Sequence, residues 1–131
     1  KGTYLIKARS CVDFKTLLKN NWLGCLTLMY ERELYSQYRF PNIRKRQDWG
    51  MWLSIMRGGT LAYSVPEPLA VYNVRPDSLS NSSKTSLISH TWYFYKDYLE
   101  FNSVKSFFYL AQYLMIQIKL KINIPKLLPD E

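Results

Sequence analysis

The chain has 131 residues, enough to bury one hydrophobic core and too few for two well-developed ones. Apolar residues make up 47% and aromatic residues 16%, which excludes a disordered tail. The formal net charge of +8 favours anionic partners such as phosphorylated ligands, acidic lipid headgroups or nucleic acid, without choosing among them.

The N-terminal segment is predicted to be a strand followed by a short helix. Lys1–Val12 alternates loosely, which suits a strand with one solvated face. Cys11 and one further cysteine, Cys25, lack the spacing of a zinc site or a disulfide framework, so we expect reduced thiols and a cytoplasmic protein. Asp13 is placed to cap a helix over Phe14–Lys19. No signal-peptide pattern follows the first lysine, and we expect the chain to begin within a longer protein.

An apolar run and a polar segment come next. Trp22–Tyr30 is short, apolar and bounded by turn residues, which predicts a strand buried on both faces. Gly24 lies at its start, where a backbone can approach a ligand or a neighbouring element closely. Glu31–Tyr38 is predicted to be a surface turn of helix, and Phe40–Asn42 breaks it.

The stretch Arg44–Gly59 predicts a buried helix. Its apolar residues fall at i, i+3, i+4 and i+7, the spacing of a helix face packed on a core: Trp49, Trp52, Leu53 and Met56. Either Gly58 or the glycine after it can adopt the left-handed conformation that closes a helix.

Asp48 stands at the start of this helix, inside its apolar arc, and has two interpretations. It can cap the helix by accepting the backbone N–H of Gly50 or Met51. It can instead be a functional carboxylate at the rim of a cleft. The residues alone favour the cap and leave the second interpretation open.

Two short strands and a polar loop follow. Thr60–Val65 and Leu69–Val74 are predicted strands, and Arg75–Ser83 is a loop by composition. Arg75 has serines and backbone amides close by in sequence, which suits either a phosphate contact or a solvated arginine. No P-loop and no Gly-x-Gly-x-x-Gly motif is present.

The C-terminal part is predicted to be helical. Lys84–Leu99 forms one helix, in which His90 is interpreted as structural. Ser103–Lys121 forms a second, whose apolar part is well below the ~20 residues that span a bilayer. It suits an interfacial helix on an anionic membrane, a helix docked into a partner, or a helix packed in the core, and the sequence leaves these open. Pro125–Glu131 is predicted to be a tail.

Four segments together carry a resemblance to a known family. In chain order they are Asn21–Tyr30, Pro41–Leu53 with its Arg-Gln-Asp-Trp sequence, Glu67–Tyr72 with Glu-Pro-Leu-Ala, and Ser78–Ser80. This order resembles the C-terminal half of family 2 glycosyltransferases, the bacterial GT-A enzymes of surface-polysaccharide synthesis. The implied fold is α/β, the acceptor-side part of a GT-A domain over residues 1–100, with a short mixed sheet, packing helices and a C-terminal amphipathic helix over 101–124.

The resemblance also implies roles for single residues. Asp48 matches the family's catalytic base, and Gln47 replaces the glutamate that usually precedes it. Arg75 stands where many members carry a histidine that reaches the metal and diphosphate, so a diphosphate contact is implied for it and no metal ligand. Arg44 and Arg46 are expected to clamp diphosphate or a phosphorylated lipid, or else to form a solvated basic turn.

The family's N-terminal half, with the Asp-x-Asp motif that holds Mn²⁺ or Mg²⁺, has no counterpart in this sequence. The implied enzyme transfers a sugar with inversion from a nucleotide-sugar to a polysaccharide or lipid-linked acceptor, and this part alone is expected to be inactive. Trp49, Gln47 and Gly24 are expected on the acceptor side, and the protein at the inner face of the membrane, with its oligomeric state open. The rival hypothesis is a non-catalytic basic, aromatic module that binds acidic membrane or nucleic acid; no nucleic-acid-binding motif supports it.

Overall fold

The computed structural model describes residues 6–71 and 84–122, which form a short sheet and a set of packed helices. In chain order the elements are β1 (Cys11–Val12), α1 (Phe14–Lys19), the 3₁₀ turn η1 (Cys25–Thr27), α2 (Arg32–Gln37), α3 (Gln47–Met56), β2 (Ala62–Tyr63), α4 (Lys84–Tyr93), the π-helical turn η2 (Phe94–Tyr98) and α5 (Ser103–Ile122). The two strands are antiparallel, with Cys11 opposite Tyr63 and Val12 opposite Ala62. The fold is therefore mixed helix and sheet, compatible with the predicted α/β class.

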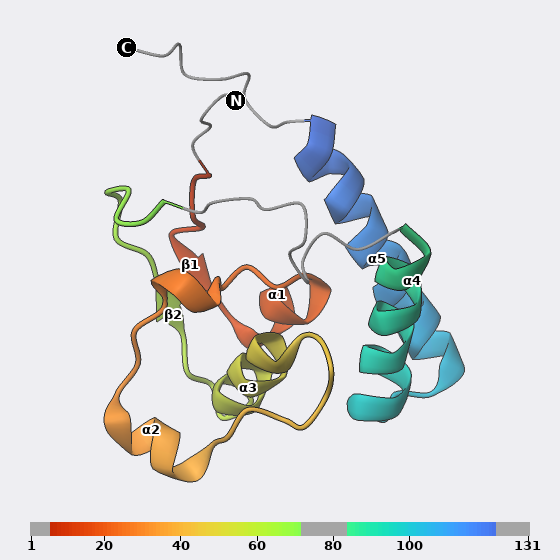
Figure 1. Cartoon of the computed structure of the whole chain (residues 1–131), viewed down its shortest axis with the longest axis horizontal. Helices are drawn as coiled ribbons and strands as arrows, with labels where there is room; N and C mark the ends of the chain where they lie inside the picture. The colour runs from red at the N-terminus through yellow and green to blue at the C-terminus, as the bar shows by residue number, and fades with distance from the viewer. Residues whose placement is uncertain (1–5, 72–83, 123–131) are drawn as a thin grey trace.

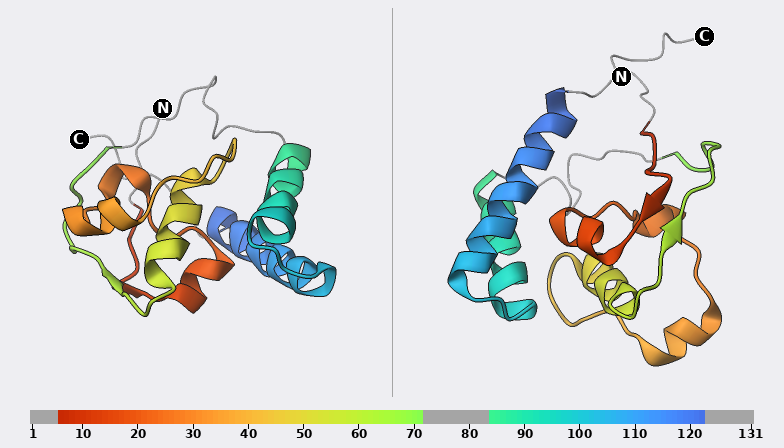
Figure 2. Two further views of the ribbon diagram at one scale, coloured as in Figure 1. Left: turned by 90° about the horizontal axis from the view of Figure 1, so that it is seen from below. Right: turned by 180° about the vertical axis from the view of Figure 1, so that it is seen from behind.

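Helices α1 and α3 lie between two flanks (Figures 1 and 2). The long helix α5 lies beside α4 on one flank, and the two strands with α2 form the other. Helix α5 contacts both α4 and α1, so the C-terminal helices are packed onto the first helix of the chain. Helices α1 and α5, which are far apart in the sequence, thus pack in one core.

The centre of that core is aromatic. Trp49 is fully buried, and its ring stacks on Phe94 at a centroid distance of 4.6 Å. Its indole N–H donates to the Leu17 carbonyl at 2.8 Å, and the Tyr95 hydroxyl donates to the Leu18 carbonyl at 2.7 Å. Carbonyls in the last turn of a helix lack partners within the helix. Two core side chains therefore complete the hydrogen bonding at the end of α1.

Several predicted helices are confirmed. Asp13 caps α1 by accepting the Thr16 amide at 2.8 Å, and hydrogen bonding to the side chain and then the amide of Thr16 holds the pKa of the Asp13 carboxyl below its usual value. Helix α2 lies within the predicted surface segment. Helix α3 ends at Met56, and Gly59 follows with a positive φ of 94°, the conformation expected of one of the two glycines.

Three predicted strands are wrong in whole or in part. Trp22–Tyr30 forms the 3₁₀ turn η1 flanked by irregular chain, and Met29 is 95% exposed, so this run is not a buried strand. Of the strand predicted over Lys1–Val12, residues 6–10 have no strand structure. Residues 69–71 of the strand predicted at Leu69–Val74 are irregular and exposed, and residues 72–74 lie outside the described residues. Many of the apolar side chains in these three segments are exposed in the structure: Ile6, Leu26, Met29, Leu69 and Val71.

The second C-terminal helix is close to its predicted bounds, since α5 ends one residue beyond Lys121. Within residues 6–71 and 84–122, no helix is long and apolar enough to cross a membrane. Predicted tail residues 125–131 lie outside the described part of the chain.

Candidate functional site

Asp48 is the second residue of α3, and its carboxylate does not cap that helix. The N-cap is Arg46, which has a left-handed backbone (φ 67°, ψ 25°) and makes no side-chain cap bond. The Asp48 Oδ2 atom instead accepts a hydrogen bond of 3.0 Å from the side-chain amide of Asn21. The interpretation of Asp48 as a helix cap is therefore wrong.

Asn21 fixes the Asp48 carboxylate from a distant part of the sequence. It follows α1 directly, and its side-chain oxygen accepts the Leu23 amide at 3.3 Å, so both ends of the side-chain amide are engaged. Asn21 begins the first of the four segments that carry the family resemblance, but no role was predicted for its side chain. Nothing local in the sequence marks this contact, because 27 positions separate Asn21 from Asp48.

Asp48 is half-buried, and the described residues engage only one of its carboxylate oxygens. Among residues 6–71 and 84–122, no donor reaches Oδ1. A carboxylate held through one oxygen can accept a proton through the other when a hydroxyl group comes within about 2.6–3.2 Å. The arrangement suits a general base.

Arg46 is held within the fold. Its guanidinium donates to the hydroxyls of Thr91 and Tyr113, on α4 and α5. It also lies over the rings of Trp49 and Tyr113, at 5.2 and 4.9 Å from their centroids. Its Nε atom is buried and has no partner in the described structure. Arg46 thus links α3, α4 and α5 in this structure, and the diphosphate contact expected of it stays a prediction.

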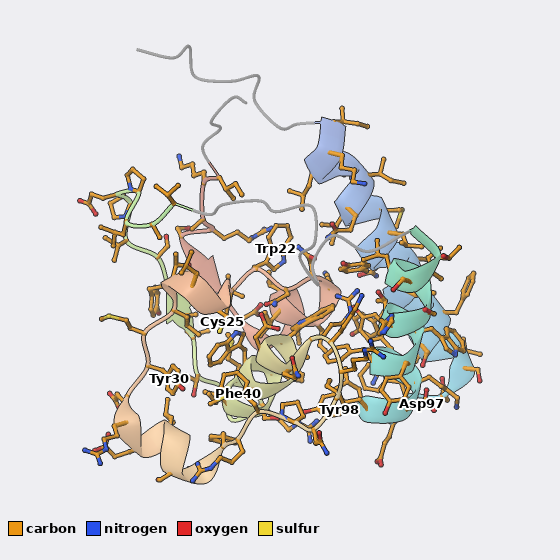
Figure 3. The ribbon with its side chains drawn as sticks, in the orientation of Figure 1. Trp22, Cys25, Tyr30, Phe40, Asp97 and Tyr98 are labelled. Atoms are coloured by element: carbon orange, nitrogen blue, oxygen red, sulfur yellow. The ribbon has the colours of Figure 1, made fainter. Side chains whose placement is uncertain are left out.

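Trp49 is also a core residue. Its side chain is 0% exposed, between Phe94 on η2 and Tyr113 on α5. In the described part of the chain no face of the Trp49 ring is free to stack on a sugar, which argues against the expected acceptor contact. Trp52 is buried as well and packs edge-on against Tyr30 and Phe40, which Figure 3 shows beside α3.

The other predicted site residues remain at the surface or outside the described structure. Arg44 and Gln47 are exposed, on either side of Arg46 in the sequence. Gly24 is exposed at the start of η1, where the nearest atom to an added methyl group would be Thr27 Oγ1 of the same turn, at 3.5 Å. No neighbouring element approaches it. Arg75 lies outside the described residues.

No metal site is present in the part of the chain that the structure describes. No group of three or more histidine, cysteine, aspartate or glutamate side chains gathers there. His90 bonds to its own helix, with Nδ1 lying 2.7 Å from the Ser86 carbonyl oxygen, which agrees with the structural role predicted for it. The described residues therefore do not fit a divalent cation.

Comparison with known proteins gives consistent matches. The chain is 35% identical over 117 residues to the putative teichuronic acid biosynthesis glycosyltransferase TuaG of Bacillus subtilis, a match that covers 89% of this chain and 46% of that protein. It is 31% identical over 109 residues to the UDP-Glc:alpha-D-GlcNAc-diphosphoundecaprenol beta-1,3-glucosyltransferase WfgD of Escherichia coli, covering 82% of this chain and 42% of the relative. An uncharacterized glycosyltransferase of Haemophilus influenzae is 29% identical over 111 residues, which are 83% of this chain and 43% of that protein.

The chain thus spans less than half the length of the relatives it matches. No protein-family model matches it, and no solved structure does. Two of these relatives are named glycosyltransferases and the third a glucosyltransferase, so all three names describe glycosyl transfer.

Proposed function

Starting from its similarity to glycosyltransferases over most of its length, we propose that this chain is the acceptor-side part of an inverting, family 2, GT-A-type enzyme. Asp48 is its general base. The observation that carries this assignment is the half-buried Asp48 carboxylate, held by Asn21 through one oxygen and open at the other. It lies in the segment whose sequence resembles the family's catalytic region.

The chemical step assigned to Asp48 is proton removal from the acceptor. The acceptor hydroxyl oxygen bonds to the anomeric carbon while the bond from that carbon to the departing diphosphate breaks. The hydroxyl proton passes to Asp48 Oδ1, so the oxygen attacks as its negative charge develops. The bond from Asn21 keeps the carboxylate in one orientation, which limits the reorganisation needed at that moment.

The donor side belongs, in this proposal, to protein outside this chain. The relatives are about twice as long as the matched segment, and the described residues gather no metal ligands. Apolar side chains around β1, η1 and β2 are exposed, which supports further protein packing there: Ile6, Leu26, Tyr63, Val65, Leu69 and Val71. The nucleotide-sugar and a Mn²⁺ or Mg²⁺ ion would bind in that other part, and this chain alone would be inactive.

The acceptor class follows from the relatives. One is named for teichuronic acid biosynthesis and one for transfer to a diphosphoundecaprenol-linked sugar. We propose that this enzyme likewise extends a polysaccharide or a lipid-linked saccharide, at the cytoplasmic face of the membrane. Gln47 is exposed and directly precedes Asp48 in the sequence, so we expect its side chain to contact that acceptor.

The test of the base is Asp48→Asn in the full-length protein. Sugar transfer is expected to fall by about 10²–10⁴-fold, the range of a general base, while nucleotide-sugar binding stays largely unchanged. Asp97→Asn is the matched control, because Asp97 is exposed and lies on the side of η2 away from α3 (Figure 3). Near-normal turnover of Asp48→Asn would falsify the assignment. Binding to single-stranded nucleic acid that falls with salt and is the same in both variants would favour the rival module.

Asn21 tests the positioning of the carboxylate. Asn21→Ala removes the donor to Asp48, so kcat is expected to fall by about tenfold or more while the dissociation constant of the nucleotide-sugar stays the same. Asn42→Ala removes an exposed amide two residues before Arg44 and is expected to leave kcat unchanged. Equal kcat values for the two variants would show that the Asn21 contact has no catalytic effect.

A further inference from the structure

Helix α5 has a face that packs into the molecule and a separate face that nothing described covers. The packed face contains Ser106, Leu110 and Tyr113, which are buried. Gln117 continues it by donating at 2.9 Å to the side-chain oxygen of Asn20 at the end of α1. These residues recur at i, i+4, i+7 and i+11, so they form one line along the helix.

The second face is apolar along the whole helix. Its six large side chains are between 55% and 81% exposed: Val104, Phe107, Phe108, Met115, Ile118 and Ile122. At about 100° per residue they fall within an arc of roughly 100° on the far side from the buried line. Large exposed apolar patches mark contacts with proteins or membranes, so we expect this face of α5 to have a partner.

The charges of α5 are all positive. The helix contains Lys105, Lys119 and Lys121 and no acidic residue. On the helical wheel Lys119 falls just beyond one edge of the apolar arc and Lys121 just beyond the other, and both are exposed. Lysines at the edges of an apolar stripe can extend to phosphate groups while their methylene chains stay among apolar atoms.

From this placement we propose that the outward face of α5 lies flat on an anionic lipid membrane. A helix in the interface buries its apolar face at the headgroup boundary and is held by basic residues that meet acidic lipids. A second copy of this chain fits less well. Pairing two α5 faces would bring lysines together with no carboxylate on either helix to neutralise them. The inference is independent of the role of Asp48.

The contact would be peripheral and would orient the molecule. The same helix that meets the membrane is bonded to the end of α1 through Gln117 and Asn20. The Asn21 that holds Asp48 is the next residue. Attachment through α5 therefore fixes the distance between the membrane and the Asp48 carboxylate through one continuous set of contacts.

Vesicle flotation of the full chain tests the proposal. With vesicles of equal parts phosphatidylglycerol and phosphatidylcholine, the wild-type chain is expected to float, and to do so less as salt is raised. Phe107→Asn/Phe108→Asn is expected to lower the bound fraction by about tenfold or more. Leu69→Asn/Val71→Asn is the matched control, since these apolar side chains are even more exposed but lie on the opposite flank, and it is expected to float like wild type. Unchanged urea unfolding midpoints in both double variants confirm that only the surface differs.

The lysines provide an independent arm. Lys119→Gln/Lys121→Gln is expected to reduce flotation with the anionic vesicles, whereas Lys15→Gln/Lys19→Gln, which removes the same charge from exposed positions on α1, is expected to reduce it less. Equal flotation with anionic and pure phosphatidylcholine vesicles, or equal loss in all four variants, would overturn the proposal. So would a dimer in sedimentation equilibrium that Phe107→Asn/Phe108→Asn dissociates, because the face would then bind a second copy.

Discussion

At the scale of single residues, Gly50 shows how closely the parts of this chain approach one another. It lies in the first turn of α3 and is buried in the structure. A methyl group on its Cα would lie 2.9 Å from Pro41 Cγ and 2.9 Å from both Cε1 and the hydroxyl oxygen of Tyr98. Figure 3 shows Tyr98 on the side of η2 that faces α3. Glycine at this position lets the segment before α3 and the turn η2 meet over the helix.

Gly50→Ala is therefore expected to destabilise the full chain by about 1–3 kcal/mol, the usual cost of adding a group to a filled core. The measurement is the free energy of unfolding in urea. Gly58→Ala is the matched control, because nothing lies within 4 Å of the added methyl group there. The control is expected to be neutral or stabilising by less than about 1 kcal/mol. Equal destabilisation by both substitutions would contradict the close approach.

Arg46 makes a second residue-scale prediction. Its flat guanidinium donates to two hydroxyls and covers two rings at once, a geometry that a lysine ammonium cannot reproduce. Arg46→Lys is expected to lower the free energy of unfolding by about 1–2 kcal/mol. Arg44→Lys, at an exposed position two residues earlier, is expected to change it by less than about 0.5 kcal/mol. Equal urea midpoints for the two variants would show that these Arg46 contacts do not contribute to stability.

At the scale of elements, the sequence predicted what depends on neighbours in the chain. Helix α1 has its aspartate cap and α3 has four apolar residues at helical spacing, and both were predicted close to their bounds. The strand predicted over Trp22–Tyr30 was wrong because the pattern of apolar residues does not show whether other elements cover them, and here much of the segment is exposed. The same limit applies to the site. Asp48 was predicted as the base through resemblance. Its hydrogen-bond partner Asn21 could not be predicted, and neither could Thr91 and Tyr113 as the partners of Arg46, because these residues come from elements distant in sequence.

The contact between α1 and α3 through Trp49 can be tested with Trp49→Phe. The substitution removes the donor to the Leu17 carbonyl and leaves a cavity in the core, so the expected loss is about 2–4 kcal/mol of unfolding free energy. Trp22→Phe makes the same chemical change at a half-buried tryptophan with no hydrogen bond to a core carbonyl, and about 1 kcal/mol or less is expected. Chemical denaturation followed by circular dichroism measures both. A smaller loss of unfolding free energy for Trp49→Phe than for Trp22→Phe would show that this contact does not stabilise the core.

At the scale of the whole molecule, the core links stability to pH through Tyr95. Burial raises the pKa of the Tyr95 hydroxyl well above its usual value of 10.0, and the nearby Arg46 guanidinium opposes this only in part. The folded state therefore keeps the phenol proton at pH values where the unfolded chain releases it. The stabilisation from this group is complete below pH 10 and is lost as the pH rises above that value, by up to about 1.4 kcal/mol per pH unit.

Tyr95→Phe is expected to weaken this alkaline loss of stability. At neutral pH the variant is expected to be less stable by about 1–3 kcal/mol, because the Leu18 carbonyl loses its donor. Above pH 10 the difference from wild type is expected to shrink as the pH rises. Urea unfolding at a series of pH values measures the difference, and every group other than the Tyr95 hydroxyl is common to the two proteins. A difference that stays constant with pH would place the Tyr95 hydroxyl in contact with solvent.

The π-helical turn η2 has a consequence for tolerance to insertions and deletions. Its Leu99 amide bonds to the Phe94 carbonyl at 3.0 Å, five positions back, so this turn holds one more residue than an α-helical turn. That extra residue lets Phe94 stack on Trp49 while its neighbour Tyr95 reaches the end of α1. Removing a single residue from η2 would restore a regular α-helix and rotate the residues on one side of it by about 100°. Among related sequences, we therefore expect length changes in the exposed segments around α2 and none between Tyr93 and Leu99.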